Sequence, residues 1–162
     1  LADVLVPHSE LTQNAYVIEV PEGGTAVAEA PKATDPEPIF ALLASADAIA
    51  GEKLAKKCTA CHVFDPVSYT HLTLWNIVNA EKGAVDGFSY SGALVDFGGQ
   101  WDYAALNAFL YKPKAYISGT KMNFVGLKKP SDRANMIAYL RQQADAPAAL
   151  PTDAEIAAES GS

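Results

Sequence analysis

Both cysteines of the chain lie in one short stretch, Cys58-Thr59-Ala60-Cys61-His62. Two cysteines three positions apart, followed directly by a histidine, form a pattern that attaches haem covalently. The two thiols can reach the two vinyl groups of one porphyrin, and the imidazole can ligate its iron. A Cys-x-x-Cys pair also occurs in redox-active disulfides and as half of a zinc site.

The rest of the sequence supports these two alternatives poorly. A redox-active pair is expected within a βαβ unit, and the chain shows no such alternation of strand and helix patterns. A structural zinc ion takes four ligands, whereas the chain offers two cysteines and three histidines scattered at positions 8, 62 and 71. We therefore favour one covalently bound haem c per chain, held by Cys58, Cys61 and His62.

Charge divides the 162-residue chain into three parts. Residues 1–47 carry one lysine and eight acidic side chains (−7), residues 48–146 carry eleven basic and eight acidic side chains (+3), and residues 147–162 carry three acidic side chains (−3). An approaching partner responds to the local field rather than to the net charge. The basic central part is therefore expected to dock on an acidic partner.

The same division predicts the domain organisation. Residues 1–46 are rich in Ala, Pro, Glu and Gly, bury too little apolar surface to offset their ordering entropy, and are predicted to be a flexible acidic linker. Leu1–Pro7 resembles the end of a transmembrane helix, so an anchor upstream is expected, and Tyr16–Val20 could instead be a short strand on the core. Residues 47–146 are the predicted haem domain, and residues 147–162 a disordered acidic tail.

Apolar residues at helical spacing predict a helix over about Asp47–Cys58 that leads into the haem site. Gly51 interrupts this pattern. A glycine inside a helix costs about 1 kcal/mol relative to alanine, which indicates that a second helix crosses closely there. The expected partner is a helix over about Pro130–Gln143, with proline at its start and Ser131 or Asp132 as its cap.

Another helix is predicted over Asp102–Tyr111, capped by its first residue and ending before the next proline, followed by a helical turn over Lys114–Ile117. The glycine-rich segments Gly87–Tyr90 and Phe97–Trp101 are predicted loops, and no convincing strand pattern is present. The domain is therefore expected to be all-α with long loops. A domain of about 100 residues tolerates such loops when a large apolar cofactor completes its core.

Several separated motifs resemble the class I c-type cytochromes and follow one another in the order typical of that family. They are Gly51-Glu52-Lys53, Lys56-Lys57-Cys58, Gly87-Phe88-Ser89-Tyr90-Ser91, Trp101, Tyr116–Phe124 and Ile137-Ala138-Tyr139-Leu140. The resemblance covers residues 48–146. It implies the class I cytochrome c fold, in which the N- and C-terminal helices cross around one haem. The most similar members are bacterial membrane-anchored cytochromes c that donate electrons to haem-copper oxidase.

By this resemblance Met122 is the second axial ligand, opposite His62. Its thioether is a soft, weak donor that favours Fe(II), which raises the reduction potential relative to a second imidazole. The other interpretation of Met122 is a core-filling side chain, as we take Met136 to be.

The resemblance assigns four further side chains to the haem. Tyr90 and Trp101 are implied to hydrogen-bond to the haem propionates, which suits a buried phenol or indole that needs a partner. Thr120 is implied to assist the same propionate, and Phe124 to pack at the exposed haem edge. The alternative for Tyr90 and Trp101 is a role as core aromatics.

The loop after His62 departs from the family pattern. The family has a glycine-rich loop ending in Gly-Pro-x-Leu, whose proline carbonyl accepts from the free ring nitrogen of the haem histidine. Here Pro66–Leu72 stands in its place, and it resembles the translated end of a transposon adapter. A carbonyl from about Thr70–Thr73 could replace the contact, or the nitrogen could face water; we expect a mobile loop with a partial replacement. Asn79-Ala80 also replaces the family's Gly-Arg, which removes a cation near the propionates.

These features predict a one-electron carrier without a catalytic acid or base. Family likeness implies a monomer that carries electrons from a cytochrome bc complex to a haem-copper oxidase. Haem c is attached outside the bacterial cytoplasmic membrane, so the family likeness also implies a location on the periplasmic side of the inner membrane. The alternative is a haem-based sensor or peroxidase-like enzyme in which Met122 swings away. The lysines predicted to surround the haem edge and to dock on acidic partners are Lys53, Lys56, Lys57, Lys112, Lys114, Lys121, Lys128 and Lys129.

Overall fold

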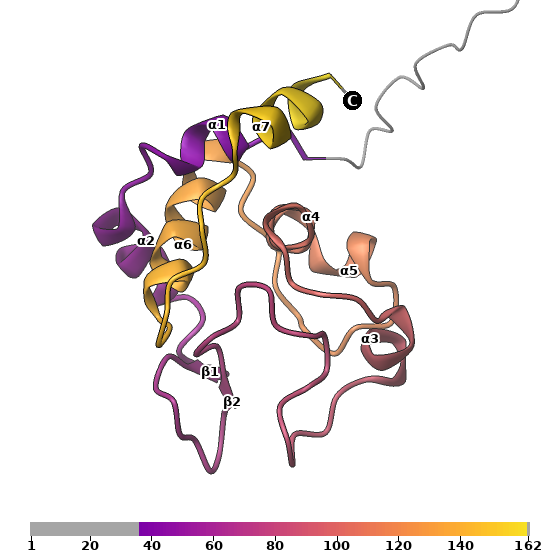
Figure 1. Cartoon of the computed structure of the whole chain (residues 1–162). Coiled ribbons are helices and arrows are strands. Elements are labelled where there is room, and N and C mark those ends of the chain that lie inside the picture. Colours follow the sequence, from indigo (N-terminus) through magenta and orange to yellow (C-terminus); the bar gives the residue numbers. More distant parts are fainter. Residues whose placement is uncertain (1–35, 162) are drawn as a thin grey trace, which may run out of the picture.

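The fold is organised by the crossing of α2 (Ala48–Ala55) and α6 (Pro130–Gln142), seen in Figure 1. The computed structural model describes residues 36–161. A Cβ atom added at Gly51 would overlap the backbone carbonyl of Asn135 on α6. The close crossing predicted from this glycine is therefore confirmed, and it explains why a residue unfavourable in helices lies inside one.

Helix-capping side chains begin two of the predicted helices where the sequence placed them. The Asp47 carboxylate accepts from the backbone N–H groups of Ile49 and Ala50 at 2.8 and 3.2 Å. The Asp102 carboxylate accepts from Ala105 N–H at 2.7 Å and starts α4 (Tyr103–Tyr111). Such contacts satisfy amide donors that a helix N-terminus otherwise leaves unpaired.

The short helix α5 (Pro113–Tyr116) follows, and the turn predicted there is confirmed. The predicted cap of α6 is wrong. Its N-cap is Lys129, whose side chain makes no capping bond, and Ser131 and Asp132 lie inside the first turn. Pro130 at the first helical position needs no partner for a backbone N–H, which lowers the need for a side-chain cap.

Three short elements between α2 and α4 were not predicted. Helix α3 (Gly92–Phe97) begins at Ser91, whose hydroxyl accepts from Leu94 N–H at 3.3 Å. Strands β1 (His62–Val63) and β2 (Leu72–Thr73) pair in parallel, so the expectation of no strand was wrong. Strands of two residues are too short to produce a periodic hydrophobic pattern.

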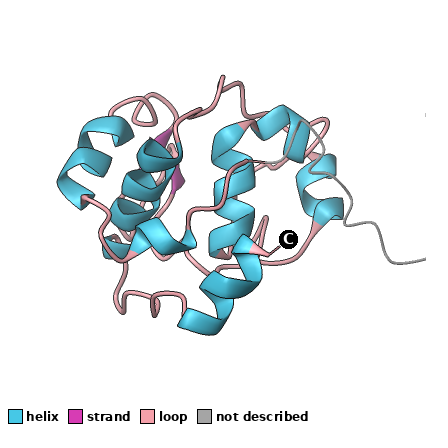
Figure 2. Cartoon of the chain, turned by 90° about the horizontal axis from the view of Figure 1, so that it is seen from above, coloured by secondary structure: helices cyan, strands magenta, loops and turns pink. Residues whose placement is uncertain are grey.

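Loops connect these elements over long stretches, as predicted. Between β1 and α3, residues 64–91 contain no helix. Figure 2 shows long loops joining the helices. The predicted all-α class is therefore confirmed. None of the helices within residues 36–161 is long and apolar enough to span a bilayer.

The domain begins earlier than predicted. Helix α1 (Phe40–Leu43) packs on the core through Ile39, which is 0% exposed, and through Leu43 at 4%. These apolar side chains, placed after an acidic proline-rich stretch, had been assigned to the linker on composition alone. The possible membrane-exit segment Leu1–Pro7 and the possible strand Tyr16–Val20 lie outside the described residues.

The end of the chain also differs from the predicted disordered tail. Helix α7 (Asp153–Ser160) starts with a reciprocal capping box between Thr152 and Glu155. Its Glu159 carboxylate accepts from the backbone N–H groups of Ile39 and Phe40 at 3.1 and 2.7 Å. Figure 1 shows α7 lying beside α1. A polar, acidic helix is thus ordered by pairing with the otherwise unpaired amides that begin α1.

Arg133 joins these end segments to the core. Its fully buried guanidinium donates to the Asn107 side chain at 2.6 Å and to the carbonyls of Leu127 and Lys128 at 3.1 and 2.8 Å. It also contacts the Glu37 carboxylate at 3.0 Å. Because a buried charge is tolerated only when its donors are satisfied, these contacts make Arg133 a stable link between α6, α4 and the segment before α1.

We expect Gly51→Ala to lower the free energy of unfolding of the haem-loaded protein by about 1–3 kcal/mol, the range for overpacking a tight contact. The added methyl group would overlap the Asn135 carbonyl and outweigh alanine's better helix propensity. Gly92→Ala is the matched control, because a Cβ there meets no atom closer than Asp96 Oδ2 at 4.0 Å. Denaturant unfolding followed by haem absorbance measures both variants, and equal losses of stability would contradict the close crossing.

Candidate haem site

The cysteine and histidine side chains follow the end of α2 in a series of hydrogen-bonded turns. Cys58 N–H donates to the Ala55 carbonyl at 2.8 Å, and the N–H groups of Cys61 and His62 donate to the Cys58 carbonyl at 3.0 and 2.9 Å. The predicted helix therefore ends at Ala55, three residues before the first cysteine. Both thiols are free, with Cys58 half-buried and Cys61 exposed.

These turns lie against a cavity of about 380 Å³. Its size falls within the range of about 300–1,000 Å³ typical of ligand and cofactor sites. The walls are largely apolar and come from α3, α4, α6 and the loops after β1. The apolar side chains that line it include Leu72, Leu74, Ile77, Leu94, Leu106, Phe109, Leu110, Met136 and Leu140.

All eight side chains that the sequence assigned to the haem line this one cavity. They are Cys58, Cys61, His62, Tyr90, Trp101, Thr120, Met122 and Phe124. Residues from positions 58 to 124 thus meet at one place. No group of three or more His, Cys, Asp or Glu side chains that could hold a metal ion occurs in the described part of the chain, so the zinc alternative finds no further ligands there.

The imidazole of His62 is oriented by the strand pair. Residue His62 is in register with Leu72 across β1 and β2, and its Nδ1 lies 3.2 Å from the Leu72 carbonyl oxygen. The alternative in which a carbonyl from about Thr70–Thr73 replaces the missing proline contact is therefore confirmed, with Leu72 as the acceptor, and the favoured partial replacement is corrected. This bond leaves Nε2 available to a metal, as in other oriented histidine ligands. Burial lowers the pKa of His62, while the bond to Leu72 acts in the opposite direction.

Met122 lies in the loop between α5 and α6, half-buried and facing the cavity. Its backbone N–H donates to Thr120 Oγ1 at 3.3 Å. Gly126 in the same loop has φ +90, and a Cβ there would overlap the Tyr111 carbonyl, so only glycine lets the loop pass this close to α4. Met136 on α6 is 1% exposed and also lines the cavity.

Three hydrogen-bond donors in the cavity wall have no acceptor within residues 36–161. The indole N–H of Trp101 makes no bond there, although this side chain is only 6% exposed. The Tyr90 hydroxyl accepts from Val85 N–H at 3.3 Å, and Thr120 Oγ1 accepts from Met122 N–H, but neither O–H has an acceptor among these residues. Donors left unused in an apolar wall fit a cofactor that brings its own carboxylates.

The donor set and the cavity together fit haem. Two thiols lie at the cavity wall, an oriented imidazole and a thioether both face it, and the unused donors suit carboxylate side chains. Sequence reasoning had not assigned the apolar wall, although the helical spacing of Leu106, Phe109 and Leu110 on α4 could have indicated it.

Known proteins agree with this interpretation. No protein-family model matches the chain. The chain is 40% identical over 134 residues to a "Cytochrome c homolog" from Bradyrhizobium diazoefficiens, covering 81% of this chain and 70% of the relative. A "Cytochrome c homolog" from Rickettsia bellii is 38% identical over 146 residues, covering 87% of this chain and 82% of the relative. The chain belongs to the cytochrome c family.

A solved structure supports the same conclusion for the fold. Cytochrome cH from Methylobacterium extorquens is 41% identical, with a TM-score of 0.56, and the match covers 59% of this chain and 98% of that protein. The predicted class I cytochrome c fold is confirmed. This c-type cytochrome carries covalently bound haem c and is an electron-transfer protein.

We expect Met122→Leu to keep the covalent haem, to open the sixth iron position and to lower the reduction potential by on the order of 0.1 V, within the span of about 0.8 V that axial ligands set. The substitution preserves volume but removes the thioether. Met136→Leu makes the same chemical change at the other methionine of the cavity wall, and the ferrous protein should still exclude CO. Absorbance spectra, CO binding and potentiometry distinguish the two.

An unchanged spectrum and potential in Met122→Leu would show that this residue is not the ligand. CO binding by the unaltered ferrous protein would favour the sensor or peroxidase-like alternative, because a stable sixth ligand blocks CO.

Proposed function

We propose that this chain is a one-electron carrier of a periplasmic respiratory chain, which accepts electrons from a cytochrome bc complex and donates them to a haem-copper oxidase. The observation that carries the proposal is the convergence of eight predicted haem contacts on one cavity. In the proposal, Cys58 and Cys61 would attach the haem, and His62 and Met122 would hold its iron. When bound, the cofactor supplies reversible one-electron exchange between Fe(III) and Fe(II).

The protein's own residues adjust that exchange. The Leu72 carbonyl keeps the His62 ring oriented, and the Met122 thioether favours the reduced state. The apolar wall excludes water and so lowers the local dielectric, which disfavours the more highly charged ferric state. Tyr90 and Trp101 would donate to the propionates.

Lysines near the cavity support docking on an acidic partner. Lys57 and Lys121 line the cavity itself, and both are exposed. The Lys121 ammonium donates to the carbonyls of Ser89 and Tyr90 at 3.0 and 3.2 Å, and the Lys114 ammonium donates to the Asn123 side chain at 2.9 Å. A lysine already held in place loses less side-chain entropy when a partner binds. The other lysines of the proposed docking ring, all exposed, are Lys53, Lys56, Lys112, Lys128 and Lys129.

Association with the oxidase is expected to slow as ionic strength rises, because exposed charges are screened over about 10 Å at 0.1 M salt. Lys57→Glu should lower the association rate at low salt, by about tenfold or more, within the range that electrostatic steering provides. Lys53→Glu makes the same change in net charge at a lysine of the docking ring that does not line the cavity, and it should lower the rate less. Stopped-flow oxidation of the ferrous protein measures both rates. Equal effects of the two variants, or no salt dependence, would contradict docking at the cavity mouth.

The proposal includes a membrane tether, through an anchor upstream of Leu1. It rests on the acidic, Ala/Pro/Glu-rich composition of residues 1–35, which lie outside the described residues. Deleting residues 9–35 from an anchored form is expected to slow oxidase turnover in membranes, because a short linker keeps a domain at about millimolar effective concentration near its partner. Turnover with detergent-solubilised oxidase is the control and should not change. Unchanged turnover in membranes would remove the tether from the mechanism.

A further inference from the structure

Lys82 differs from every other lysine in the described part of the chain. The other eight are exposed, whereas Lys82 is half-buried. Its ammonium donates to the Gln100 carbonyl at 2.6 Å and lies 5.0 Å from the centroid of the Trp101 ring and 5.4 Å from that of Phe97. No carboxylate within residues 36–161 comes within ion-pair distance of it. Lys82 is thus a cation held by a carbonyl and two aromatic faces.

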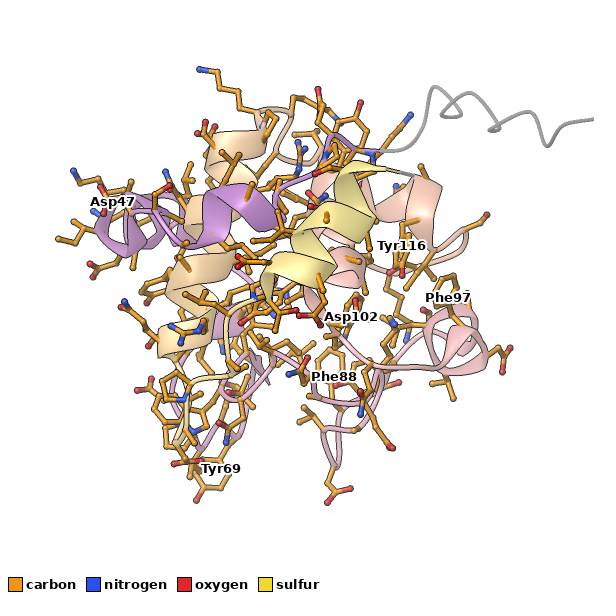
Figure 3. All side chains as sticks on the ribbon, turned by 45° about the horizontal axis from the view of Figure 1, so that its top comes forward. Asp47, Tyr69, Phe88, Phe97, Asp102 and Tyr116 are labelled. Carbon is orange, nitrogen blue, oxygen red and sulfur yellow. The ribbon has the colours of Figure 1, made fainter. Side chains whose placement is uncertain are left out.

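The backbone fixes this position. Lys82 N–H donates to the Gly99 carbonyl, and Trp101 N–H donates to the Ala80 carbonyl, each at 2.8 Å. Gly99 has φ +72, and a Cβ atom there would lie 3.5 Å from the Lys82 ammonium. Such a distance is an ordinary van der Waals contact, so glycine is needed here for the turn and not for space. In Figure 3 the labelled Phe97 and Asp102 mark the two ends of the segment that Lys82 contacts.

Trp101 connects this lysine with the cavity. Its ring packs on Phe109 with centroids 4.8 Å apart, and both rings line the cavity. The ammonium of Lys82 is therefore separated from the cavity by a single aromatic side chain, whose N–H has no acceptor among the described residues. Burial lowers the pKa of Lys82 and Asp102 acts in the opposite direction, which agrees with an ammonium that has lost part of its water.

We propose that Lys82 has two roles. It is a positioning residue that holds Trp101 in the cavity wall, and its partly desolvated positive charge raises the reduction potential. The inference rests on the proposed one-electron function. Reduction lowers the positive charge of the site, so a nearby cation stabilises the reduced state relative to the oxidised state. A charge lying on aromatic faces is screened by salt less than an exposed lysine is.

The test compares three variants of the haem-loaded protein by potentiometry. Lys82→Met removes the charge while keeping a long side chain, and we expect a shift of about threefold in the ferric-to-ferrous equilibrium toward the ferric state, the order for a partly screened charge. This shift should persist at high salt. Lys82→Arg should restore the potential. Lys53→Met, at an exposed site, should produce a smaller shift that high salt abolishes.

A second readout separates the electrostatic role from a structural one. Lys82→Gln is measured beside Lys82→Met, so that one poorly folding variant does not decide the outcome. Near-UV circular dichroism of each variant reports the packing of Trp101. A lowered thermal midpoint with an unchanged potential in both variants would overturn the proposal. A potential that falls equally in Lys82→Arg would also overturn it. The Met122→Leu spectrum tests the proposed ligation independently of either result.

Discussion

The contact between α2 and α6 at Gly51 is the constraint on which the rest of this structure depends. Because nothing larger than a hydrogen atom fits against the Asn135 carbonyl, the two helices can cross there without separating. Because of this crossing, α2 ends beside the cavity, so that Cys58 and the turns that follow it lie against the cavity wall. It also sets the inner face of α6, from which Met136 and Leu140 form part of the same wall.

The two ends of the described chain form a second layer that depends on this crossing. Arg133 lies on α6 and is fully buried, and it holds the segment before α1 through Glu37. Glu159 then fixes α7 on the first amides of α1. Each contact pairs groups that would be costly to leave unpaired, a buried guanidinium in one case and helix-terminal amides in the other. The haem domain therefore extends at both ends beyond the region with the family's motifs.

The cavity combines an apolar wall with a few polar groups that have defined tasks. Leu72, Tyr90, Trp101 and Thr120 each present one donor or acceptor in an otherwise apolar surrounding. This arrangement suits a cofactor that is mostly hydrocarbon with two charged side chains. The replacement of the family's Gly-Arg by Asn79-Ala80 predicted a loss of positive charge in this region, yet the fold places another cation, Lys82, against Trp101.

The sequence by itself determined the chemistry and the main helices. The Cys-x-x-Cys-His spacing is local, so it identified the cofactor without a fold, and the start of α4 was readable because Asp102 caps within three residues of itself. The start of α2 was predicted from apolar residues at helical spacing. Tertiary structure decided what depends on distant partners. The pairing of the two-residue strands β1 and β2 places the Leu72 carbonyl beside His62, and the amides that order α7 lie 120 residues away in sequence. Neither a two-residue strand nor an acidic helix without a buried face leaves a hydrophobic pattern, so composition alone indicated a loop and a disordered tail.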